Sequence, residues 1–133
     1  MPRKFSAVLF LLVFCLLAAV SCSPAKLPPL EGEPAELADE FISCLDRGDF
    51  EDAVDFFDVR MKRAMPAQTL EQTWKDLVKE HGSYEGQTAV SEEVIDGYDV
   101  VFVTAEFAAE EMIIRVVFGE DRRGAGLWFE PVQ

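Results

Sequence analysis

The spacing of apolar residues changes once along the chain. Between Ala35 and His81 apolar side chains recur every three or four residues, and after Gly82 they recur at every second residue. The first spacing is typical of amphipathic helices and the second of half-buried strands. This order predicts an α+β domain in which helices come first and a sheet follows.

Three helices are expected in the first part of this domain. The first ends at Gly48, and Asp49 caps the second. The third begins at Pro66, because proline suits the first turn of a helix, and it ends at His81. The stretch DVRMKRAM at 58–65 is interpreted as a connection whose basic residues pair with surrounding acids.

An antiparallel meander of four strands is expected after Gly82. The strands are SYEGQTAVSEEVI, YDVVFVTAEF, MIIRVVF and GLWFEPV, and the pair Asp96-Gly97 predicts a tight hairpin between the first two. In the second and third strands one face carries Val101, Val103, Ala105, Phe107, Met112, Ile114, Val116 and Phe118, and the other carries Tyr98, Val100, Phe102, Ile113, Arg115 and Val117. Helices can cover one of these faces. The other is too apolar for a fully hydrated sheet, so either a second subunit covers it or the sheet curls around an interior.

An export signal precedes the domain. Two basic residues in MPRK are followed by an apolar run from Phe5 to Val20, which is the order of a secretory signal peptide. The run is shorter than a membrane-spanning helix requires, so an uncleaved signal anchor is the weaker alternative. Cleavage after Ser21 places small residues at Ala19 and Ser21 and makes Cys22 the first residue of the mature chain.

The stretch AAVSCSP resembles a lipobox, the signal of bacterial lipoproteins. The resemblance implies that Cys22 is lipidated and that the acyl chains anchor the protein to the cell membrane or the outer membrane, with the domain outside the cytoplasm. The chain then divides into a signal peptide at 1–21, a lipidated cysteine with a proline-rich tether at 22–34, and a single α+β domain at 35–133. As an extended spacer the tether would hold the domain roughly 35 Å from the membrane.

The composition narrows the range of partners. Loss of residues 1–21 removes Arg3 and Lys4, which leaves 10 basic residues against 25 acidic ones and a formal charge of −15. Nucleic-acid binding is excluded, because it needs a basic surface. Cys15 is lost with the signal, so Cys44 has no partner if Cys22 is lipidated, and we expect it to be a buried apolar residue.

No catalytic motif is found. The sequence has no G-x-S-x-G elbow and no glycine-rich phosphate loop, and its one histidine, His81, suits the end of a helix. One histidine and one free cysteine are too few ligands for zinc. We therefore expect no cofactor, no metal and no enzymatic activity.

Several stretches resemble one family. The GDF between the first helices, the helix start MPAQTLEQTW and the closing GLWF look like an uncharacterised bacterial and archaeal domain. That domain often precedes a secreted α/β-hydrolase and also occurs alone on lipoproteins. The family resembles the nuclear-transport-factor-2-like (cystatin-like) cone, which implies three helices packed on a curved four-stranded antiparallel sheet, often dimeric through that sheet. The resemblance implies no catalytic residues.

A cone of this type can hold a pocket, or it can dimerise. Residues that could line a pocket or interface are Tyr84, Tyr98, Asp99, Glu106, Arg115 and Trp128. Some relatives of the cone use an acid and a tyrosine for isomerase or dehydratase chemistry. In the alternative interpretation the aromatic residues belong to the core and Arg115 pairs with Glu106 across strands. The main hypothesis is a lipid-anchored module that binds an envelope protein or a small ligand. A pocket enzyme, an accessory to a separate secreted hydrolase and a structural homodimer are the alternatives.

Overall fold

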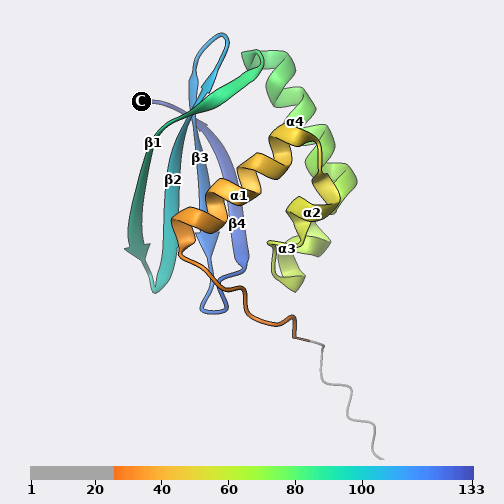
Figure 1. The fold of residues 1–133 in the computed structure, drawn as a ribbon, viewed down its shortest axis with the longest axis vertical. Helices are drawn as coiled ribbons and strands as arrows, with labels where there is room; N and C mark the ends of the chain where they lie inside the picture. Colours follow the sequence, from red (N-terminus) through yellow and green to blue (C-terminus); the bar gives the residue numbers. More distant parts are fainter. Residues whose placement is uncertain (1–25) are drawn as a thin grey trace, which may run out of the picture.

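The fold is an α+β domain with a four-stranded antiparallel sheet, as the sequence predicts. The computed structural model describes residues 26–133. The helices are α1 (Pro34–Arg47), α2 (Phe50–Val54), α3 (Val59–Ala64) and α4 (Ala67–His81), and the strands are β1 (Tyr84–Ile95), β2 (Tyr98–Phe107), β3 (Glu111–Phe118) and β4 (Gly124–Pro131). The strands pair in the order β1-β2-β3-β4, and Figure 1 shows them as a curved sheet.

Helix α1 ends where the sequence predicts. Gly48 adopts a left-handed conformation with φ of 80°, which glycine reaches without steric cost. Its main-chain N–H donates to the carbonyl of Leu45, and the N–H of Asp49 donates to the carbonyl of Cys44 at 2.8 Å. These two bonds satisfy carbonyls that the end of the helix leaves without partners.

The expectation of three helices was wrong by one short helix. Within the described residues a fourth, α3, occupies most of the stretch interpreted as a connection. Asp58 starts it, because its side chain accepts a 2.7 Å hydrogen bond from the main-chain N–H of Met61. This carboxylate satisfies a donor that the first turn of a helix would otherwise expose.

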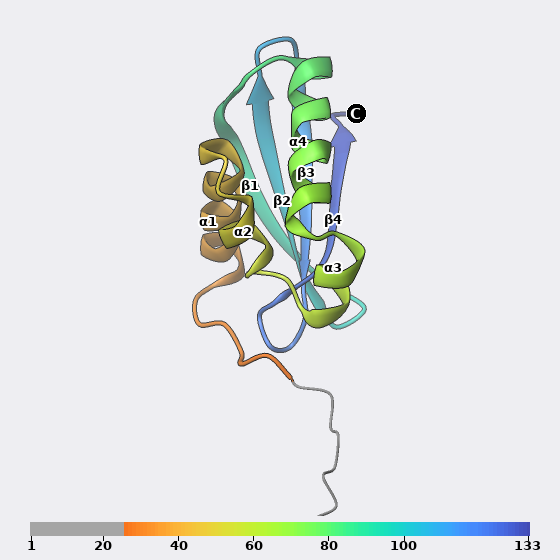
Figure 2. The same cartoon turned by 90° about the vertical axis from the view of Figure 1, so that its right-hand side faces the viewer.

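All four helices of the described chain lie on one face of the sheet (Figures 1 and 2). The residues of β2 and β3 that face them are buried and are those predicted from the alternation: Val101, Val103, Ala105, Phe107, Met112, Ile114, Val116 and Phe118. They pack against Phe41 and Leu45 of α1 and against Leu70 and Trp74 of α4. We call the opposite side of the sheet, which no described helix covers, the outer face.

Part of the predicted tether belongs to the folded domain. The N–H of Leu30 donates to the carbonyl of Asp121 at 2.9 Å, and the guanidinium of Arg122 donates to the carbonyl of Gly32 at 3.2 Å. Helix α1 then begins at Pro34, one residue before the expected boundary. The extended spacer is therefore shorter than the range 22–34 suggested.

The predicted signal peptide and the lipidation site at Cys22 lie outside the described residues. Within residues 26–133 no helix combines the length and the apolar character that crossing a membrane requires.

Candidate functional site

The structure separates the residues predicted to share a pocket. Tyr84 faces the helices, whereas Tyr98, Glu106, Arg115 and Trp128 lie on the outer face. Strand alternation causes this division, because neighbouring residues of a strand point to opposite sides of the sheet. Of the predicted set, the structure brings Arg115 and Trp128 into direct contact.

Arg115 stacks on Trp128 at the centre of the outer face. The two residues are direct neighbours across β3 and β4, and the guanidinium carbon lies 4.4 Å from the centre of the indole ring. One guanidinium nitrogen, Nη2, forms a 2.9 Å ion pair with Oε1 of Glu130. The Nε atom is buried and has no hydrogen-bond partner among the described residues.

The expected pair between Arg115 and Glu106 was wrong. The residue opposite Arg115 on β2 is Phe102, and Glu106 lies opposite Glu111 next to the β2–β3 turn. Glu130 of β4 pairs with Arg115 instead, one position diagonal to its direct neighbour Trp128.

Gly126 makes room for the indole of Trp128. Both residues lie on the outer face of β4, two positions apart. A Cβ atom at position 126 would be 2.4 Å from Cζ3 of the indole, far inside the normal contact distance. The ring therefore lies over the bare main chain of Gly126, with the guanidinium of Arg115 stacked on it. An aromatic ring that covers a strand glycine in this way is a known device of β-sheets.

The outer face is apolar at its centre and acidic around it. Its apolar residues are Ile95, Tyr98, Val100, Phe102, Ile113, Val117 and Trp128. Tyr98 is 44% exposed and Trp128 is 46% exposed, so two large aromatic side chains face solvent. Four glutamates lie on the same face: Glu93, Glu106, Glu111 and Glu130.

Tyr84 occupies the side of the sheet that the helices cover. Its ring packs edge to face on Trp74 at 5.7 Å and on Phe107 at 5.6 Å. Burial raises the pKa of the Tyr84 phenol, and the charges of Asp46 and Asp39 raise it further. The phenol is therefore neutral at physiological pH, and the sheet lies between it and Glu106, so these two residues do not form an acid–tyrosine pair.

The other titratable candidates, His81 and Cys44, pack against neighbouring residues of the domain. His81 ends α4, where its Nδ1 contacts the carboxylate of Glu110 and its ring packs on Phe107. Cys44 is buried in the core, and desolvation raises the pKa of its thiol. Among residues 26–133 no three metal-ligating side chains lie close enough together to hold an ion.

One important residue was not predicted at all. Arg123 lies between the third and fourth predicted strands and received no role there, but its side chain is 6% exposed and donates to main-chain carbonyls far away in sequence. The acidic surroundings of Trp128 were also missed, although period-two alternation places Glu106 and Glu130 on that face.

The comparisons with known proteins place the chain in one family. The family described as "Protein of unknown function (DUF3887)" matches residues 38–127, which is more than half of the chain. No curated protein and no solved structure matches the sequence or the fold. The match runs from within α1 into β4 and so covers most of the folded domain, and the chain belongs to the DUF3887 family.

Proposed function

We propose that the protein is an exported, lipid-anchored module without catalytic activity, and that it binds a partner protein through the outer face of its sheet. The observation that carries this proposal is the exposed aromatic centre of that face, where Trp128 is held over Gly126 by Arg115. Aromatic residues and arginine are enriched at the energetic centres of protein interfaces. The cone-like arrangement predicted from the family belongs to this proposal, and the helices packed on one face of a curved sheet support it.

The charges of the outer face favour a partner with a basic rim. Four glutamates and one arginine give this face a formal charge of −3. Glu106 and Glu111 lie directly opposite each other, and like charges in this arrangement destabilise a sheet. Lysine or arginine from a partner would relieve this repulsion, whereas a second copy of the chain would bring an equal negative charge. We therefore assign the face to a different protein whose apolar centre is surrounded by basic residues.

The anchor is tested by replacing Cys22 with alanine. The variant should move from the membrane fraction to the soluble fraction when the cell envelope is separated with detergent, because the acyl chains that hold it would be absent. A variant that stays membrane-bound would assign the anchor to the apolar segment at 5–20.

The binding surface is tested by photo-crosslinking in the native envelope with a reactive residue in place of Phe102. The crosslinked protein should be lost in Trp128→Ala and in Glu106→Gln/Glu111→Gln, and crosslinking should weaken as salt is raised. Val94→Ala is the matched control, because Val94 is 73% exposed on β1 and lies on the other side of the sheet.

Two outcomes would overturn this assignment. Crosslinking that is unaffected by both outer-face variants would place the partner elsewhere on the molecule. A dimer in sedimentation analysis that dissociates in Trp128→Ala would show that a second copy covers this face.

A further inference from the structure

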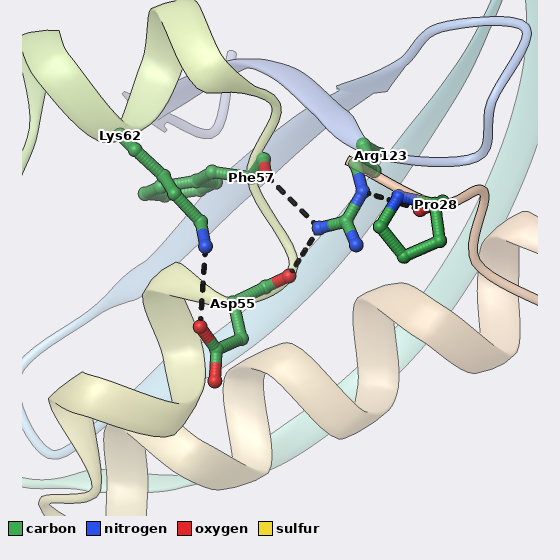
Figure 3. A network of polar contacts seen from close by, with 5 residues as sticks. All are labelled: Pro28, Asp55, Phe57, Lys62 and Arg123. Atoms are coloured by element: carbon green, nitrogen blue, oxygen red, sulfur yellow. Dashed lines mark hydrogen bonds and ion pairs between the residues drawn. The ribbon is translucent and has the colours of Figure 1, made fainter. Parts of the chain in front are cut away.

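A buried arginine joins the segment before α1 to the body of the domain. Figure 3 shows the guanidinium of Arg123 between three main-chain carbonyls. Its Nε donates to the carbonyl of Pro28 at 2.8 Å, and its Nη1 donates to those of Asp55 at 2.7 Å and Phe57 at 3.2 Å. The acceptors come from the segment before α1 and from the turn after α2, so one side chain holds together parts of the chain that are far apart in sequence.

We call residues 28–33 the strap. Besides the bond to Arg123, the strap donates from Leu30 to the carbonyl of Asp121, and its Gly32 carbonyl accepts from Arg122. The side chain of Leu30 is half-buried against the core. The strap is therefore attached along its length to the β3–β4 hairpin.

The bond from Arg123 makes release of the strap unfavourable. If the strap left, the Nε of Arg123, a residue that is only 6% exposed in the folded domain, would lose this acceptor. A hydrogen bond to a charged group shifts such an equilibrium by about 10- to 150-fold. The docked strap is thus a fixed element of the domain from Pro28 onward.

We infer that the strap determines which end of the domain faces the membrane, an inference that rests on the proposed anchor at Cys22. Pro28 follows Cys22 by six positions in the sequence, and a fully extended chain of that length reaches roughly 20 Å. The strap leaves the domain at the end that carries α3, the β1–β2 turn and the β3–β4 turn (Figures 1 and 2). That end is held next to the membrane, and the β2–β3 turn points away from it.

This orientation has two consequences for the molecule. An open groove of about 920 Å³ at the strap end faces the membrane, and the residues that line it include Lys26, Arg60, Tyr98 and Glu120. The strands run away from the membrane, so the outer face stands sideways and a partner beside the protein can reach it. The excess of acidic residues also repels the domain from an anionic membrane, and the length of the tether limits how far the domain can move away.

Docking of the strap is tested by hydrogen exchange on the full chain in detergent. The amide of Leu30 should be protected in the wild type, and Arg123→Lys should speed its exchange by about 10- to 150-fold, because lysine cannot donate along the three directions of the guanidinium. Arg63→Lys, at an exposed position of α3, is the matched control and should change nothing. Should Arg123→Lys not fold, Leu30→Ala loosens the strap while leaving the arginine in place. Exchange of Leu30 in the wild type at the rate of an unstructured segment would overturn the inference.

The orientation is tested by energy transfer to acceptor-labelled lipids in vesicles that carry the anchored protein. Donor dyes are attached in Glu120→Cys, on the β3–β4 turn, and in Ala109→Cys, on the β2–β3 turn, both with Cys44→Ala. Transfer should be stronger from position 120, and Arg123→Lys should reduce the difference between the two positions. Equal transfer from both positions in an anchored protein would refute the orientation and leave the proposed anchor standing. Release of every labelled protein from the vesicles would refute the anchor itself.

Discussion

Replacing Gly126 with alanine tests whether the sheet holds Trp128 flat on the outer face. The new Cβ would lie 2.4 Å from Cζ3 and 2.6 Å from Cη2 of the indole. Carbon atoms in contact are normally about 3.5–4.0 Å apart, so the ring has to move by roughly 1 Å or more. The Cβ of Val117 at 3.5 Å is an ordinary contact, so the clash falls on the indole.

Two opposing terms set the expected change in stability. Displacing the indole removes its stacking with Arg115, a contact of about 0.5–1 kcal/mol at exposed sites and about 2 kcal/mol when desolvated. Alanine in place of a strand glycine stabilises by about 0.5–1 kcal/mol through the unfolded state. When Gly126→Ala is made in the wild-type background, the lost stacking energy and the gain from alanine nearly cancel. In a Trp128→Ala background only the gain remains, so the coupling between the two substitutions should be about 1 kcal/mol.

The assay is urea denaturation of the wild type, Gly126→Ala, Trp128→Ala and the double variant. Gly126→Ala should leave the free energy of unfolding within about 1 kcal/mol of the wild type while the fluorescence of Trp128 shifts to the red. The double variant should be more stable than Trp128→Ala alone. If Gly126→Ala has the same effect in both backgrounds, within about 0.3–0.5 kcal/mol, the indole does not lie over this glycine as described.

Three further predictions concern the core and its borders. Arg123→Met should lower the free energy of unfolding, measured in urea, by about 3 kcal/mol. Charge-assisted hydrogen bonds of about 1.5–3 kcal/mol each are lost, but part of the cost of desolvating the guanidinium is recovered. The control Arg63→Met should change the free energy of unfolding by less than about 0.5 kcal/mol. Gly82→Ala should lower the free energy of unfolding by more than about 2 kcal/mol and so lower the melting temperature. The reason is that φ of Gly82 is +93° and the new Cβ would lie 2.7 Å from the Cβ of Ala108. Cys44 should react with a thiol reagent far more slowly in the native protein than in urea, because burial raises the pKa of its thiol; equal rates would contradict this. The same raised pKa means that the stability contributed by the neutral Cys44 thiol is complete below the unfolded-state pKa of 9.0 and is lost as the pH rises further.

The sequence predicted the two faces of the sheet because the alternation of a strand does not depend on how strands pair. Val101 and Ile114 face the helices whatever residue lies opposite them, and the structure confirms both as fully buried. The ends of α1 and α4 were predicted for a similar reason, since Gly48 and Gly82 act on the main chain next to them.

The partner of Arg115 could not be predicted, because it depends on the register. The β2–β3 turn places Glu106 opposite Glu111, four residues along the strand from Arg115. If two strands paired in a register shifted by an even number of residues, the same apolar residues would still face the helices. The apolar pattern therefore leaves the choice between Glu106 and Glu130 open.

The short helix α3 has a signal in the sequence that is separate from its apolar periodicity. Asp58 stands three residues before Met61, which is the spacing at which a capping carboxylate accepts the main-chain N–H. The helix spans six residues and buries none of them, so its apolar pattern was too short and too weak to stand out.

Arg123 could not be distinguished from Arg122 by any local feature of the sequence. Its acceptors lie 68 and 95 residues away, at Asp55 and Pro28. The strap nevertheless shows why an arginine is needed there. Pro28 and Pro29 have no N–H, so this part of the strap cannot pair with the hairpin as an added strand would. Any hydrogen bond at this point must therefore come from a donor on the hairpin, and the fork of the Arg123 guanidinium supplies the one to the Pro28 carbonyl while reaching two other carbonyls. The two prolines that made the segment resemble a free spacer have no N–H to donate, so at this point the strap docks as an acceptor and Arg123 is its donor.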